Sequence, residues 1–195
     1  ITKEVMFEFE DYLDWEYLSL NYPFTEDIIT EFKNVINWKG LQKNKHLTEE
    51  LMLKYLDWLD IDFLVRYRSV SLDFIGVLKD VVNWNYVCKN VPLTDDFIRE
   101  YKNYMVWDIV LEKQNLSEDI VIEFRKQLNV NSFLRKIKEP ASWDFIDKIK
   151  NVADWKFITQ NYPITEEVLH RFKDYLDWDF ITPNFPFTED LLRSF

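Results

Sequence analysis

The sequence contains very little glycine, with only Gly40 and Gly76 among 195 residues. Tight turns between β-strands usually need glycine at positions of positive φ. The scarcity of glycine therefore disfavours a sheet-rich fold and favours helices. It also excludes the glycine-rich loops that hold phosphates or dinucleotides.

Histidine is as scarce as glycine, and cysteine is scarcer. Cys88 is the only cysteine, which excludes a disulfide or a thiolate metal cluster within the chain, and we expect it to be a small packing residue. His46 and His170 each lack a second histidine or cysteine at metal-ligand spacing. The sequence therefore predicts no catalytic, cofactor-binding or metal-binding residue, and no enzyme activity.

Long apolar runs and excess positive charge are also missing. No stretch approaches the roughly 18 apolar residues that a membrane-spanning helix needs, so we expect no membrane contact. The net charge is −11, which disfavours direct binding to nucleic acid or to an anionic membrane surface. A basic protein partner, or imitation of nucleic acid, stays compatible with this charge. The predicted location is the cytoplasm.

What the sequence does contain is a repeat of 23 residues. The spacing is constant except for 25 residues between Leu116 and Ala141. The repeats begin at residues 1, 24, 47, 70, 93, 116, 141, 164 and 187. A period of this length is the signature of a stacked repeat architecture.

Every repeat has a hydroxyl residue at position 2 and an acidic residue at position 4. Serine and threonine are favoured N-caps, and acids are favoured in the first helical turn. The predicted N-caps are Thr2, Thr25, Thr48, Ser71, Thr94, Ser117, Ser142, Thr165 and Thr188.

The remaining positions predict two helices per repeat. Apolar residues at positions 5, 6, 9, 12 and 13 form one helical face, so we expect a first helix through position 13. Aspartate or asparagine at position 14 predicts the N-cap of a shorter second helix. Tryptophan follows at position 15 in six repeats and is expected in the core, and Trp58, at position 12, is expected to be buried. Asparagine at position 21, which tolerates left-handed geometry, is expected to end the second helix.

These elements predict an all-α fold. Because one repeat cannot bury its apolar stripe alone, we expect an α-solenoid of about eight two-helix repeats, each a long helix plus a short helix, with a terminal half-repeat. The array is predicted to be a single helical-repeat domain over residues 1–195. Leu191, Leu192 and Phe195 would lie on the stacking face of the half-repeat, so end-to-end self-association is expected.

The sixth repeat departs from the pattern. It has Val130 in place of tryptophan and a two-residue insertion, which makes residues 126–142 an irregular junction. The stretch from Arg125 to Lys138 is also locally basic. A degenerate repeat that bends the stack is one interpretation, and a hinge or contact site is the other. The candidate partner-contact residues are Trp143, Arg125, Lys126, Arg135 and Lys136.

Three segments carry a resemblance to a known repeat. They are LTDDFIREYKNYMVWDIV, ITEEVLHRFKDYLDWDFIT and FTEDLLRSF. They resemble a tryptophan-containing helical repeat in predicted proteins of giant DNA viruses and large phages. The resemblance covers nearly the whole chain and weakens between Leu116 and Pro140. It implies a viral or phage source, and with it a host cytoplasmic location, but no catalytic residues.

The sequence therefore predicts a protein–protein interaction scaffold with one or more protein partners. Two alternatives stay open. One is an acidic nucleic-acid mimic that inhibits a DNA- or RNA-binding host or defence protein, because acids at positions 3 and 4 would line one edge of the stack. The other is a structural assembly or virion component.

Overall fold

Residues 1–193, which the computed structural model describes, form seventeen α-helices, two 3-10 helices and no β-strand. The first helices of the repeats are α1 (Lys3–Glu8), α3 (Glu26–Phe32), α5 (Glu49–Lys54), α7 (Leu72–Val77), α9 (Asp95–Glu100), α11 (Glu118–Glu123), α13 (Trp143–Ile149), α15 (Glu166–Phe172) and α17 (Glu189–Arg193). The second helices are α2 (Trp15–Asn21), α4 (Trp38–Leu41), α6 (Ile61–Tyr67), α8 (Trp84–Asn90), α10 (Trp107–Lys113), α12 (Val130–Lys136), α14 (Trp155–Asn161) and α16 (Trp178–Asn184). The 3-10 helices are η1 (Glu10–Tyr12) and η2 (Leu56–Trp58). The predicted all-α array of helix pairs is confirmed.

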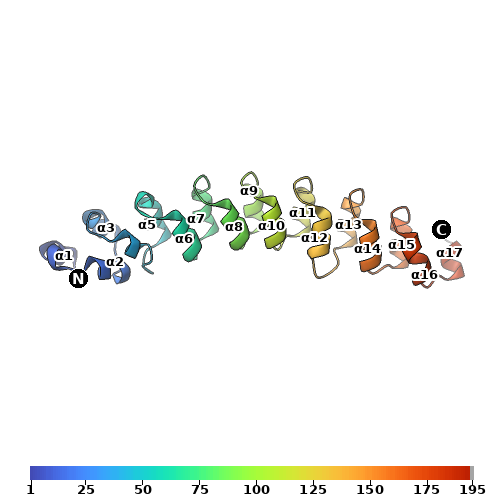
Figure 1. The fold of residues 1–195 in the computed structure, drawn as a ribbon, viewed down its shortest axis with the longest axis horizontal. Coiled ribbons are helices and arrows are strands. Elements are labelled where there is room, and N and C mark those ends of the chain that lie inside the picture. Colours follow the sequence, from blue (N-terminus) through green and yellow to red (C-terminus); the bar gives the residue numbers. More distant parts are fainter. Residues whose placement is uncertain (194–195) are drawn as a thin grey trace. The chain divides into compact units, whose positions relative to one another are not determined.

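The chain divides into two compact units, which we call the N-terminal unit (Ile1–Met105) and the C-terminal unit (Val106–Phe195). Within each unit, corresponding helices of successive repeats pack together, as α2 does on α4 and α11 does on α13 (Figure 1). The repeat of residues 93–115 contributes α9 to one unit and α10 to the other. A single domain over residues 1–195 stays a prediction.

The N-cap hydroxyls occupy the helix starts that the repeat assigns to them. Eight of the nine accept a hydrogen bond from the amide three residues later, for example Thr94 from Phe97 at 3.2 Å. Thr25 is the exception, because its hydroxyl donates to the Asp27 carboxylate instead. Asp14, Asn37 and their equivalents cap the second helices in the same way, but Val106 provides no side-chain cap.

We expect Thr94→Ala to lower the free energy of unfolding by about 0.5–2 kcal/mol, because the first turn of α9 loses its side-chain acceptor. Arg99→Ala in the same helix should change it by less than about 0.5 kcal/mol, since Arg99 forms an exposed ion pair with Asp96. Urea denaturation measures both. Equal losses would contradict the capping register.

The first helix is shorter than the pattern predicts, and this corrects the expectation of a long and a short helix. In the eight complete repeats it ends at position 8 or 9 rather than 13. The Phe32 carbonyl at position 9 accepts from the amides of both Val35 and Ile36, which tightens the chain into a turn. At position 10, the Lys33 carbonyl accepts the indole N–H of Trp38 at 2.9 Å.

The same indole bond recurs in five of the six repeats with tryptophan at position 15. In a continued helix the carbonyl at position 10 would accept from the amide at position 14. That amide instead donates to a side chain of the preceding repeat: Asn37 to Ser19 Oγ at 2.9 Å, and Asp177 to Thr159 Oγ1 at 3.2 Å. The indole thus takes the position-10 carbonyl, and the position-14 amide links the repeats. The first helix also ends at position 8 in the repeats with Ile61 and Val130, so its end does not require the tryptophan.

The tryptophans at position 15 lie half-buried at the contact between repeats. Trp155, for example, packs against Phe172 and Tyr175 of the next repeat, with ring centroids 5.2 and 5.1 Å away. Trp58 is not buried as expected. Its side chain is 47% exposed, and it stacks on Trp38 with the centroids 5.1 Å apart.

The second helices also end differently from the prediction. No residue other than glycine has positive φ in the described part of the chain, so asparagine at position 21 does not adopt left-handed geometry. In four repeats its side-chain amide donates to the carbonyl four residues earlier, as Asn90 does to Tyr86 at 3.1 Å. The side chain thus adds a second hydrogen bond to a carbonyl in the last turn of the helix.

Positions 5 and 6 account for much of the core. Ile28 and Ile29 of the second repeat are 7% and 0% exposed. In the first and last repeats, residues at these positions are more exposed to solvent: Val5 is 42% exposed and Leu192 is 58% exposed. In the half-repeat, Leu191 is buried and Phe187 stacks on Trp178 at 6.4 Å. Phe195 lies outside the described residues.

Candidate binding pocket at the irregular repeat

The irregular repeat keeps its second helix despite losing the tryptophan. Asn129 caps α12 by accepting from the Ser132 amide at 3.0 Å, and Val130 is buried in place of the indole. The two extra residues enter the connection after α12. We call residues 137–140 of this connection the insertion loop.

Trp143 stands at the start of α13 and is half-buried. Its ring lies against Phe172 and Tyr162, with centroids 5.3 and 6.0 Å away. These contacts lie within the C-terminal unit and leave the indole partly exposed, so partner contact at Trp143 stays a prediction.

The four basic candidates do not form one patch with Trp143. Arg125 and Lys126 are exposed in the turn after α11, where the Arg125 guanidinium donates to the Ile122 carbonyl at 2.9 Å. Arg135 forms an ion pair with Asp154 and lies over the Phe157 ring. Arg135 is therefore tied to the following repeat.

Lys136 reaches in the other direction, to the preceding repeat. Its ammonium donates to the carbonyls of Leu111 and Gln114 at 2.8 and 2.5 Å. Burial of this ammonium lowers the pKa of Lys136 below its ordinary value. In the N-terminal unit, Asn44 makes the equivalent bonds to Ser19 and Tyr22. Lys136 thus joins two repeats.

A pocket of about 590 Å³ opens beside the insertion loop, within the C-terminal unit. We call it the junction pocket. Its volume falls in the roughly 300–1,000 Å³ range typical of ligand sites. The junction pocket is lined by Gln114, Asn115, Leu116, Glu118, Phe133, Lys136, Ile137, Lys138, Glu139, Pro140 and Ala141.

The insertion changes the connection between repeats beside this pocket. In three connections the first amide of a repeat donates to a carbonyl two residues earlier, as Phe24 does to Tyr22 at 2.9 Å. At the insertion, the Ala141 amide donates instead to the Tyr162 hydroxyl at 3.3 Å. The insertion loop also borders a smaller pocket of about 200 Å³ next to Phe157 and Tyr162. It therefore stands between two cavities.

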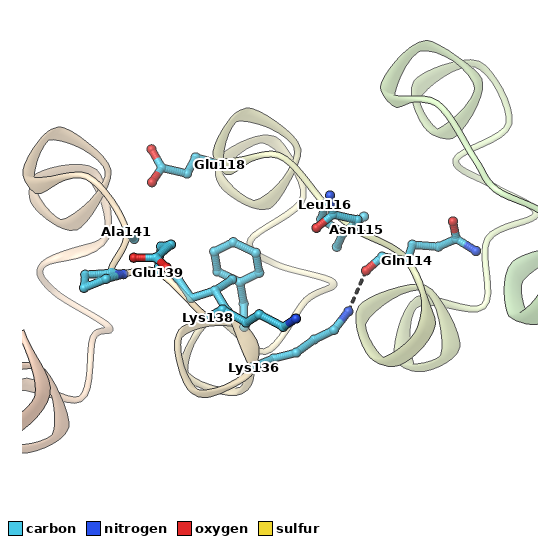
Figure 2. Close-up of a pocket in the computed structure, with 11 residues that line it drawn as sticks. Gln114, Asn115, Leu116, Glu118, Lys136, Lys138, Glu139 and Ala141 are labelled. Carbon is cyan, nitrogen blue, oxygen red and sulfur yellow. Dashed lines mark hydrogen bonds between the residues drawn. The ribbon is translucent and has the colours of Figure 1, made fainter.

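The charged side chains of the junction pocket differ in whether they have a partner within the protein. Glu118 accepts from the Ser142 amide and hydroxyl at 2.7 and 2.6 Å. Lys138 and Glu139 are exposed and have no hydrogen-bond or ion-pair partner in residues 1–193. Figure 2 shows the labelled lining residues and the bond from Lys136 to Gln114.

The sequence located the region of this pocket but missed most of its lining. The insertion and the basic composition pointed to residues 126–142, and of the five candidates only Lys136 lines the junction pocket. Asn115 and Leu116 belong to the connection one repeat earlier, which the insertion faces. The repeat length could have indicated them, since Asn115 and Leu116 stand where the repeat with the two extra residues begins.

Outside the junction pocket, residues 1–193 contain no exposed cysteine and no metal-binding cluster. Cys88 is fully buried, with its sulfur 3.9 Å from that of Met105, as expected for a packing residue. Residues 1–193 contain no cluster of three histidine, cysteine, aspartate or glutamate side chains placed to hold a metal ion. Within the same residues, no helix has the length and apolar character that crossing a bilayer requires.

No protein-family model, curated protein or solved structure is detectably similar to this chain. The resemblance to viral and phage repeats therefore stays an expectation from the sequence. The evidence for function comes from the helix-pair array and the junction pocket.

Proposed function

We propose that the chain is a non-enzymatic protein-interaction scaffold that binds a segment of its partner in the junction pocket. The observation that carries this proposal is the interruption of the repeat at one interior place, where the insertion loop opens a cavity of about 590 Å³. Regular repeats supply rigid walls on both sides. Leu116, Phe133 and Ala141 are buried residues of the lining and provide apolar surface, and Asn115 and Lys138 provide polar groups.

Imitation of nucleic acid has less support. Acids at positions 3 and 4 bind neighbouring repeats: Glu26 pairs with Lys54, Glu49 accepts from Ser71, and Asp144 pairs with Arg171. These contacts favour a structural role for the acidic row over a comb of free charges. A viral or phage source is a proposal that rests on the sequence resemblance alone.

Assembly through the ends stays an alternative because one observation favours it. The exposed Val5 and Leu192 occupy positions that neighbouring repeats cover elsewhere in the array. A further repeat would cover them, whether it came from a longer chain or from a second copy.

Selection of random eight-residue peptides displayed on a carrier tests the proposed site. We expect the protein to enrich peptides whose binding, measured by fluorescence polarisation, falls at least tenfold in Asn115→Trp, because the indole would fill the mouth of the pocket. Ser69→Trp makes a similar change at the same repeat position in the N-terminal unit, where the side chain is exposed. It should bind normally.

The same two variants define the result that would contradict the proposed site. If Asn115→Trp binds every selected peptide as well as Ser69→Trp does, the junction pocket is not the binding site. The circular dichroism spectrum of each variant, which should match that of the unmodified chain, shows that a loss of binding does not reflect unfolding.

A further inference from the structure

The junction pocket has two charged ends. In Figure 2 the amino ends of Lys136 and Lys138 extend toward the side where Gln114 and Asn115 lie, and the carboxylates of Glu118 and Glu139 lie on the side of Ala141. All four charged residues line the same cavity. The cavity is therefore neutral in total, with positive and negative charge on opposite sides.

Two of these charges are already used by the fold. Lys136 donates to two backbone carbonyls, and both carboxylate oxygens of Glu118 accept from Ser142. Lys138 and Glu139 are the pair without partners in the described residues. An ammonium and a carboxylate that are adjacent in sequence but extend to opposite sides can each meet an opposite charge on one ligand.

The insertion loop also offers backbone donors. The amides of Lys138 and Glu139 donate to no acceptor within residues 1–193, and Pro140 has no amide hydrogen. The amides of Asn115 and Leu116, in the facing connection, also donate to no acceptor within residues 1–193. Backbone donors need acceptors when water is displaced, and the carbonyls of an extended peptide supply them at regular intervals.

Between the charged ends the lining is apolar. Leu116, Phe133 and Ala141 are 8%, 4% and 6% exposed, so their surfaces form the floor rather than the rim. An aliphatic side chain placed there would lose contact with water, which is the main favourable contribution to binding. Exposed charges at the rim add little affinity but select the partner.

From these features we infer that the occupant is an extended peptide segment in which an apolar side chain lies between an acidic and a basic one. The acidic group binds Lys138, the basic group binds Glu139, and the apolar side chain enters the floor. This inference rests on the proposed function, because it names the partner chemistry of the same pocket.

The test uses the peptides that bind the unmodified chain but not Asn115→Trp. Their sequences should be enriched in both an acidic and a basic residue relative to the starting library. Lys138→Glu should weaken them about three- to tenfold, because the change removes an attraction and adds a repulsion. A new selection with Lys138→Glu should lose the acidic preference, and one with Glu139→Lys should lose the basic preference.

Lys126→Glu is the matched control, since Lys126 is exposed, has no partner in residues 1–193 and lies outside the pocket lining. It should leave both affinity and preference unchanged.

Pocket-bound peptides without paired charges, or with affinities that Lys138→Glu does not change, would overturn the inference and leave the proposed function standing. Competition by a free amino acid such as leucine would show a small-molecule site instead. Binding of no peptide at the pocket would overturn both proposals.

Discussion

Phe172→Ala is expected to lower the free energy of unfolding of the C-terminal unit by about 3–5 kcal/mol. Phe172 is 1% exposed, and the rings of Trp155 and Trp143 lie 5.2 and 5.3 Å from it. Truncation would leave a cavity where the starts of α13 and α14 meet the end of α15. Urea denaturation followed by tryptophan fluorescence measures the change.

Val152→Ala provides the comparison in the same unit. Val152 is 58% exposed at position 12, a position that the sequence pattern assigns to the apolar face. Its truncation should cost less than about 0.5 kcal/mol. Similar losses for the two variants would mean that the packing between repeats differs from the one described.

The second large effect is expected at Asn44. Its side chain is 1% exposed, donates to the carbonyls of Ser19 and Tyr22 at 2.9 and 2.7 Å, and accepts from the His46 amide at 2.9 Å. Asn44→Leu keeps a similar size but leaves the Ser19 carbonyl and the His46 amide without partners, while the Tyr22 carbonyl keeps the Phe24 amide. Since each such group costs about 1–3 kcal/mol, the N-terminal unit should lose roughly 2–4 kcal/mol.

Asn90→Leu separates this effect from the general loss of an asparagine. Asn90 stands at the same repeat position, but it is exposed and bonds only within its own helix, to Tyr86. We expect a change of less than about 0.5 kcal/mol in urea denaturation. A loss as large as that of Asn44→Leu would show that the bonds between repeats add no stability.

The helix starts could be predicted from the sequence because their determinants are local. Thr94 and Asn83 are N-caps whose preference depends on the next three residues alone. The repeat length then placed every helix pair. The end of the first helix was predicted wrongly, because the apolar pattern continues through position 13 after the helix has ended.

That error has a physical source. The indole of Trp38 takes the Lys33 carbonyl, and the Asn37 amide bonds to Ser19 of another repeat. Both bonds compete with helix continuation, and neither is visible in hydrophobic periodicity. The bonds of Lys136 were missed for the same reason. The sequence suggested Lys136 as a contact residue, but it does not show that the ammonium donates to carbonyls of the preceding repeat.

The candidate site was only partly predictable. An insertion in an otherwise constant period marked residues 126–142 as irregular, but Asn115 and Leu116 enter the site through stacking of repeats, which brings distant residues together. Trp143 packs on Tyr162 of its own repeat and on Phe172 of the next, contacts that the sequence pattern does not show.

The central claim is that a partner segment binds where the repeat is interrupted. Backbone amide NMR spectra of the chain, recorded during titration with a selected peptide, test it most directly. The account predicts that shift changes concentrate in residues 114–118 and 133–141, which contain the lining of the junction pocket. Changes confined to other repeats, with these residues unaffected at saturation, would contradict it.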